Sequence, residues 1–157
     1  MALLVPSSLG DRMRSHAERT YPQECCGLLL GNIAPDGNKA IVEVWETDNV
    51  WGEDDSEPFR DADTENCTAE RRYTIPPQTL LKAQKYGRDR GLQTLGFYHS
   101  HPDSVAIPSE TDRRFAWAQY SYIIISVRQG KAIEFKSWQL DGDRHFQEEN
   151  VSMSNEQ

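Results

Sequence analysis

Gly96-Phe-Tyr-His-Ser-His-Pro-Asp-Ser-Val-Ala-Ile-Pro-Ser-Glu-Thr-Asp112 is the stretch that carries most information about the fold and chemistry of this chain. Its first part, within residues 95–101, is rich in apolar and aromatic side chains and predicts a β-strand. Side chains two positions apart on a strand point to the same face, so His99 and His101 can present two imidazole nitrogens to one ion. Pro102 lacks an N–H donor and ends the strand. We therefore expect two metal-ligating histidines at the C-terminal end of a strand.

The second part of this stretch supplies a third candidate ligand. Ser109 is a natural N-cap for a helix over residues 109–119, and this places Asp112 in the first helical turn, where it can face back toward the histidines. Taken alone, Ser109-x-x-Asp112 is better explained as a capping box, and two histidines on a strand are more often solvated than metal-bound. The combination at fixed spacing reverses this preference and favours a metal site.

Two imidazoles and one carboxylate form a ligand set that suits zinc and leaves a fourth position for water. Zinc would lower the pKa of that water to about 7 and polarise a substrate carbonyl, and a nearby carboxylate is still needed to transfer the proton. Glu24, in Tyr21-Pro-Gln-Glu-Cys-Cys-Gly27, stands at the start of an apolar strand, where burial of an idle carboxylate is costly. Glu24 is therefore the candidate general base, with a surface carboxylate near a strand end as the alternative.

Helical and strand patterns alternate along the rest of the chain and predict a single α/β domain. The expected helices span residues 8–20, 78–90 and 109–119, and the expected strands span residues 25–30, 40–47, 72–75, 95–101, 122–127 and 132–139. Residues 146–157 are expected to form a last edge strand or a frayed tail. We expect these elements to build a mixed sheet flanked by helices.

The composition limits the classes of partner and compartment. The chain has 157 residues and a formal charge of −8, and it shows no basic stripe of the kind that binds nucleic acid. Its apolar N-terminus is too short for a secretory signal or a membrane span, so we expect a cytoplasmic protein with neither nucleic-acid nor membrane partners. Three cysteines, Cys25, Cys26 and Cys67, do not resemble a paired disulfide framework. The acidic stretch over residues 48–70 is most simply a solvated insertion.

The order His-x-His-Pro, six residues, Ser-x-x-Asp, with an upstream Pro-x-Glu before an apolar strand, resembles the JAMM (MPN+) metallopeptidase family in its stand-alone prokaryotic branch. The resemblance implies that His99, His101 and Asp112 bind zinc, that Glu24 is the general acid/base, and that Ser109 stabilises the oxyanion. It also implies a JAMM/MPN domain over residues 1–145, with a curved mixed sheet between helices similar to that of the cytidine deaminases. The deaminase signature, His-x-Glu with Pro-Cys-x-x-Cys, is absent, which disfavours base deamination.

Members of this family cleave amide bonds after the C-terminal Gly-Gly of ubiquitin-like or sulfur-carrier proteins, so the resemblance implies a zinc metallopeptidase with such a substrate. A Gly-Gly tail suits a narrow channel beside a metal, because only glycine lets the backbone pass without a side chain. Two alternatives remain open from the sequence. The same site would also suit a zinc amidohydrolase acting on small peptide or amino-acid conjugates, and the fold also exists as a non-catalytic MPN-type binding module.

Overall fold

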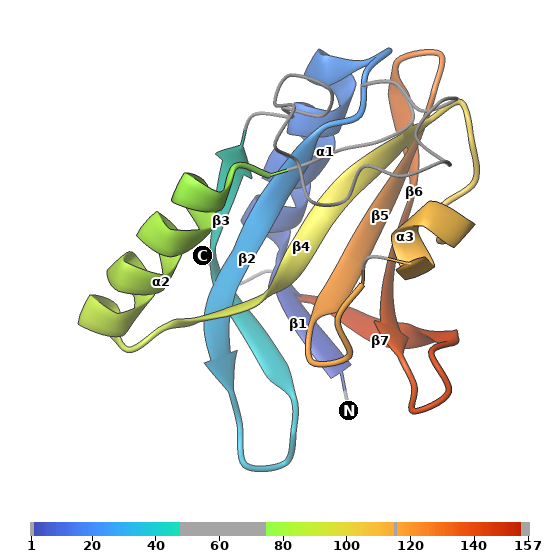
Figure 1. Ribbon diagram of the computed structural model, residues 1–157. Coiled ribbons are helices and arrows are strands. Elements are labelled where there is room, and N and C mark those ends of the chain that lie inside the picture. Colours follow the sequence, from blue (N-terminus) through green and yellow to red (C-terminus); the bar gives the residue numbers. More distant parts are fainter. Residues whose placement is uncertain (1, 48–74, 115, 155–157) are drawn as a thin grey trace.

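The computed structural model of this chain describes residues 2–47, 75–114 and 116–154, which form seven strands and three helices (Figure 1). The strands are β1 (Ala2–Pro6), β2 (Cys26–Ile33), β3 (Lys39–Thr47), β4 (Gln93–Pro102), β5 (Ser121–Arg128), β6 (Lys131–Leu140) and β7 (Phe146–Ser154). The helices are α1 (Ser7–Thr20), α2 (Pro77–Arg90) and α3 (Glu110–Arg114). The predicted α/β class with a mixed sheet and helices is confirmed.

The sheet closes on itself into a barrel, which corrects the expected curved sheet between helices. The strand order is β1-β3-β2-β4-β5-β6-β7, and β1 pairs in parallel with both β3 and β7, so the two ends of the sheet meet. Closure depends on β1, a five-residue apolar segment that was not predicted as a strand, and on β7, which pairs with β6 and β1 and is therefore not an edge strand. Closing the barrel removes the exposed sheet edges.

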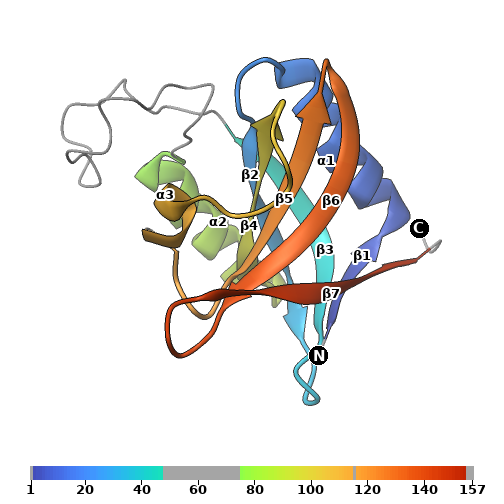
Figure 2. The ribbon, with the colours of Figure 1, turned by 90° about the vertical axis from the view of Figure 1, so that its right-hand side faces the viewer.

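Helices cover both faces of the sheet (Figures 1 and 2). Met13 and Ala17 of α1 pack into the main hydrophobic core, which receives side chains from all seven strands. On the opposite face, α2 packs through Ala83 against Leu28 and Leu30 of β2. The short helix α3 lies on the same side as α2. The sheet thus separates an inner core around α1 from an outer face between α2 and α3.

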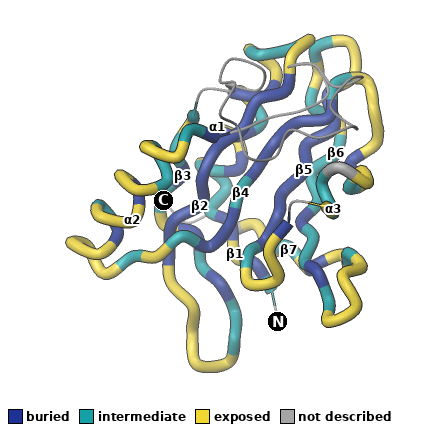
Figure 3. Tube along the Cα trace, in the orientation of Figure 1, coloured by how far each residue is buried: buried dark blue, intermediate teal, exposed yellow. Residues whose placement is uncertain are grey.

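Burial is greatest along β2, β4 and β5 (Figure 3). Residues 26–31 of β2 and residues 121–127 of β5 are buried throughout, as expected for apolar strands covered on both faces. His16 is buried as well, and its Nδ1 lies 2.8 Å from the hydroxyl of Tyr98 inside the core. The core thus hides a polar pair that periodicity alone does not reveal.

Helix α3 is shorter than the predicted helix over residues 109–119. The guanidinium of Arg144 donates hydrogen bonds to the carbonyls of Arg113 and Arg114 at 2.7 and 3.3 Å. The backbone N–H of Trp117 donates to the hydroxyl of Tyr122 at 2.7 Å instead of to a helical carbonyl. Tertiary hydrogen bonds therefore replace the helical ones, and Trp117 is 57% exposed.

Several expectations fall outside the described residues. The acidic insertion over residues 48–70 and Cys67 lie there, as does the predicted strand over residues 72–75 except for Ile75, which is buried but belongs to no strand. Among the described residues, no helix is both long and apolar enough to cross a bilayer.

Gly96 allows β4 and β5 to approach one another. It pairs with Ser121, and a methyl group at position 96 would overlap the carbonyl oxygen of Ser121 and lie 2.7 Å from its nitrogen. The obstacle is backbone, which cannot move aside as a flexible side chain can. A glycine is therefore required where the strand that carries the histidines joins its parallel neighbour.

We expect Gly96→Ala to lower the free energy of unfolding by about 2 kcal/mol or more, because the added methyl group forces β4 and β5 apart. Urea unfolding followed by circular dichroism measures this loss. The matched control is Gly142→Ala, where a methyl group meets nothing within 4 Å, and its effect should stay within about 0.5 kcal/mol. Equal stability of the two variants would contradict the close approach.

Candidate metal centre and its cleft

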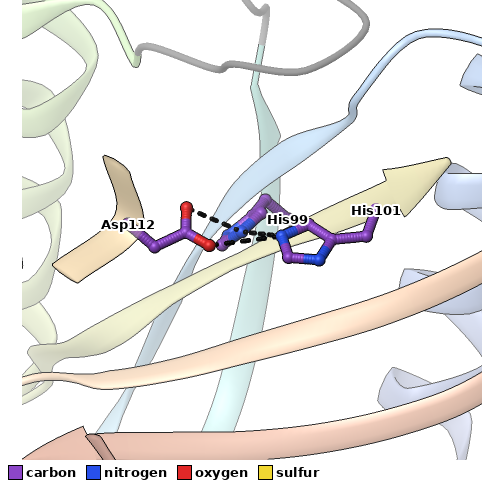
Figure 4. A group of neighbouring side chains, drawn as sticks. All are labelled: His99, His101 and Asp112. Carbon is purple, nitrogen blue, oxygen red and sulfur yellow. Dashed lines mark hydrogen bonds and ion pairs between the residues drawn. The ribbon is translucent and has the colours of Figure 1, made fainter. Parts of the chain in front are cut away.

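Strand β4 and helix α3 bring three ligand-type side chains together (Figure 4). Tyr98 points into the inner core, so its neighbours His99 and His101 cannot share that direction. They project from the outer face, where Asp112 of α3 meets them. The structure therefore brings together the three residues that the sequence analysis selected as ligands.

The distances within this triad fit a small tetrahedral ion. His99 Nε2 lies 3.2 Å from His101 Nε2, His101 Nε2 lies 3.2 Å from Asp112 Oδ2, and His99 Nε2 lies 3.3 Å from Asp112 Oδ1. In a tetrahedron with metal–ligand bonds of about 2.05 Å, the ligand atoms are about 3.3 Å apart. The spacing of the triad is thus that of one face of a zinc coordination shell.

The backbone fixes which nitrogen of His101 faces the triad. A carbonyl can only accept, so the contact of 2.9 Å between His101 Nδ1 and the oxygen of Val105 requires Nδ1 to carry a hydrogen. In the neutral ring, Nε2 then presents its lone pair to Asp112. Burial lowers the pKa of His101, but the hydrogen bond and charge of Asp112 and the Val105 carbonyl outweigh burial and raise it. A cation, either a proton or a metal ion, is favoured at this point.

Asp112 is held in place by the start of its own helix. The backbone N–H of Ser109 donates to Asp112 Oδ2 at 2.8 Å, and the N–H of Asp112 donates to the hydroxyl of Ser109 at 3.1 Å. Burial would raise the pKa of Asp112, but the charge of His99 and the hydrogen bonds with both histidines hold it well below its usual range. The capping box and the ligand position are therefore compatible, because one arrangement supplies both.

Glu24 lines the same cleft as His101 of the triad. The cleft has a volume of about 550 Å³, and its described lining includes Pro22, Glu24, His101, Asp103, Ser104 and Ser109. Glu24 is only 4% exposed, and it precedes Cys25, whose N–H donates to the hydroxyl of Ser100 at 2.9 Å. Because Ser100 separates the two histidines, this hydrogen bond places the Glu24 backbone beside the candidate ligands. The predicted general base and oxyanion residue thus line one cleft with His101.

Cys25 belongs to the hydrophobic core rather than to the cleft. Its side chain is 1% exposed and packs in the inner cluster with Leu29 and Tyr98. Burial raises the pKa of its thiol to about 12, against a smaller opposing effect of the hydrogen bond with Ser100. A thiol with this pKa stays protonated near neutral pH and is a poor ligand or redox centre. Cys25 is therefore a small apolar residue that fills the core.

Two contributors to the site were missed by the sequence analysis. The Val105 carbonyl orients His101. Every residue has a backbone carbonyl, so the residue type at position 105 does not reveal this contact. Asp103 lines the cleft and accepts hydrogen bonds from the Tyr21 hydroxyl and the Gln129 N–H. Its position directly after the His-Pro motif was an available signal, because a carboxylate beside candidate ligands commonly supports a metal site.

Comparison with known proteins identifies relatives that are named as proteases. The chain is 37% identical over 131 residues to the desampylase of Haloferax volcanii, which covers 79% of this chain and 80% of the relative. It is 32% identical over 127 residues to a probable TtuB-protein conjugate cleaving protease of Thermus thermophilus, and the match covers 81% of this chain and 72% of the relative. It is 28% identical over 139 residues to the CysO-cysteine peptidase of Mycobacterium tuberculosis, and the match covers 88% of this chain and 82% of the relative. The prediction of a hydrolytic protease is confirmed.

Solved structures and a family model agree with these relatives. The solution structure of protein DSY2949 from Desulfitobacterium hafniense superimposes with a TM-score of 0.77 at 28% identity and covers 98% of this chain and 94% of its own. The solution structure of a protein from Salinibacter ruber gives a TM-score of 0.67 at 30% identity and covers 97% of this chain and 91% of its own. The model of the prokaryotic homologues of the JAB domain matches residues 6–141. The chain therefore belongs to this prokaryotic JAB (JAMM-type) family, as its motif spacing predicted.

Proposed function

We propose that this protein is a zinc-dependent metallopeptidase that hydrolyses the peptide or isopeptide bond after the C-terminal Gly-Gly of a ubiquitin-like or sulfur-carrier protein. The observation that carries this proposal is the convergence of His99, His101 and Asp112 at tetrahedral spacing, with His101 lining a cleft that Glu24 also lines. Such a constellation pairs a metal-ligand set with a buried acid/base, which is the minimum for metal-assisted amide hydrolysis.

The three ligands would hold one zinc ion through His99 Nε2, His101 Nε2 and the Asp112 carboxylate. Zinc bound there would supply Lewis-acid activation of a water and of the scissile carbonyl. The chain prepares its own ligands for this task. The Val105 carbonyl directs the Nε2 lone pair of His101 toward the centre, and the Ser109 N–H orients the Asp112 carboxylate.

Glu24 would take a proton from the attacking water and deliver it to the leaving amine. Its near-complete burial and its position in the cleft support this role, because a carboxylate removed from bulk water holds and releases a proton at one defined place. Ser109 would stabilise the oxyanion. Its hydroxyl oxygen accepts the Asp112 N–H, and a hydroxyl that accepts in this way can still donate its own hydrogen.

The substrate class rests on the relatives and on the chemistry of the tail. The names of the relatives describe removal of conjugated proteins in two cases and cleavage of a cysteine conjugate in the third. A second candidate is therefore hydrolysis of small amino-acid conjugates by the same site. A panel of carrier fusions compared with small amides, read by product mass, separates the two. The complete set of ligand-type residues and Glu24 argues against a non-catalytic binding module.

Replacing Glu24 by Gln should lower kcat by at least about 10²-fold, because the amide cannot shuttle the proton. Zinc content should stay near one ion per chain, since Glu24 is not a ligand. Cleavage of a Gly-Gly-tailed fusion protein, together with metal analysis of the same preparation, measures both quantities. Turnover close to that of the wild type would remove Glu24 from the mechanism.

Stability should depend on pH in opposite ways with and without zinc. His101 has a raised pKa in the folded protein, so its ion pair with Asp112 stabilises the metal-free fold fully below its ordinary value of 6.5. This stabilisation is lost as pH rises through the raised pKa. Zinc competes with the proton for the same Nε2, so the added stability from zinc should grow as pH rises.

Thermal unfolding from about pH 6 to about pH 8, with a chelator or with zinc, measures the two dependences. Asp112→Asn should remove the metal-free dependence that arises from the triad and also weaken zinc binding. The exposed residue His145 provides the control, since His145→Gln should leave both dependences as in the wild type. Identical pH slopes in the presence and absence of zinc would contradict the shared site.

A further inference from the structure

The segment over residues 21–25, which joins α1 to β2 and carries Glu24, is attached to the histidine-bearing strand at two points. At its C-terminal end, the Cys25 N–H donates to the Ser100 hydroxyl at 2.9 Å, and the Ser100 N–H donates to the Cys25 carbonyl at 3.2 Å. At its N-terminal end, the Tyr21 hydroxyl donates to Asp103 Oδ2 at 2.6 Å. Ser100 and Asp103 stand on either side of His101 along the chain.

Asp103 is itself held firmly. Its backbone has a φ of 53°, and its N–H donates to the carbonyl of Val127 on β5. Its second carboxylate oxygen, Oδ1, accepts the N–H of Gln129 at 2.8 Å, in the turn between β5 and β6. The carboxylate therefore joins three segments: the end of β4, the β5–β6 turn and the segment that carries Glu24. Through these contacts, Asp103 can fix the segment that carries Glu24 relative to β4 and the β5–β6 turn.

Tyr21 is a suitable partner for such a joint. It directly follows α1, where its N–H donates to the carbonyl of Ala17, and its ring packs against the main core. Its backbone is therefore already in place, and only the hydroxyl reaches across to Asp103. This division separates packing from the hydrogen bond, because a phenylalanine keeps the first and loses the second.

We propose that Tyr21 and Asp103 form a positioning pair that fixes the segment carrying Glu24 against β4, and so sets Glu24 relative to His101. The proposed catalytic consequence rests on the proposed function. A general base acts only within hydrogen-bond reach of the proton it takes, and a displacement of about 1 Å can cost a factor of about 10². Neither Tyr21 nor Asp103 needs to touch the substrate.

Tyr21→Phe is the sharpest variant. We expect kcat to fall roughly tenfold, with KM and zinc content unchanged, because the ligands and the cleft wall stay while the segment that carries Glu24 loses its hydrogen bond to Asp103. The matched control is Tyr86→Phe, since the Tyr86 hydroxyl also donates to a carboxylate, that of Glu43, at 2.7 Å, but between α2 and β3. The control variant should keep the kcat of the wild type.

Asp103→Asn tests whether the two residues act through one bond. It should lower kcat in the same way. The double variant should have a kcat no lower than that of the less active single variant, because the second change removes no further hydrogen bond. Independent, multiplying losses of kcat would overturn the pairing. A change in KM alone would also overturn it and would assign Asp103 to substrate contact.

Hydrogen exchange supplies a measurement that does not depend on turnover. The amides of Gln23, Glu24 and Cys25 should exchange faster in Tyr21→Phe than in the wild type and in Tyr86→Phe, because the segment loses its hydrogen bond to Asp103. If the wild type cleaves no Gly-Gly conjugate, the proposed function fails, and the exchange rates still decide the positioning claim. Unchanged exchange in Tyr21→Phe, or unchanged kcat in an active enzyme, overturns it.

Discussion

Strand β4 is hydrogen-bonded on both sides, and the candidate site depends on this double pairing. On one side, β4 runs antiparallel to β2, whose start places the segment with Glu24 beside Ser100. On the other side, it runs parallel to β5, and a parallel neighbour requires a crossover connection. That connection contains α3 and Asp112. β4 therefore carries the two histidines, and its two neighbours bring Asp112 and the candidate base to them. Gly96 allows the close approach of β5 to β4.

The electrostatics of the centre follow from this geometry. The fold places two imidazoles and a carboxylate within hydrogen-bond distance of one another and excludes most of the water. Mutual attraction between Asp112 and the histidines offsets the cost of burial, which is why the pKa of Asp112 is lowered and that of His101 is raised. A divalent cation at the same point would satisfy all three groups at once. The contacts of Val105, Ser109 and Asp103 then keep the ligands and the neighbouring segment in their orientations.

Much of the fold was predictable because local patterns were strong. The continuous apolar runs of β2 and β5 and the helix that ends at Gly91 appear where periodicity and capping rules placed them. The pattern failed where distant groups decide the outcome. Helix α3 ends early because Arg144, thirty or more residues away in the chain, takes its carbonyls. The barrel closes because β1, too short to be distinguished as a strand, lies between β3 and β7.

The candidate site was likewise predictable in part. The sequence by itself determined which residues are candidate ligands, because alternation along a strand places His99 and His101 on one face and a helix start places Asp112 in reach. Only the tertiary structure decided how they meet: the triad's spacing, the tautomer of His101 and the joining of Tyr21 to Asp103. The physical reason is that strand and helix periodicities act over a few residues, whereas these contacts join atoms that only the closed barrel brings together.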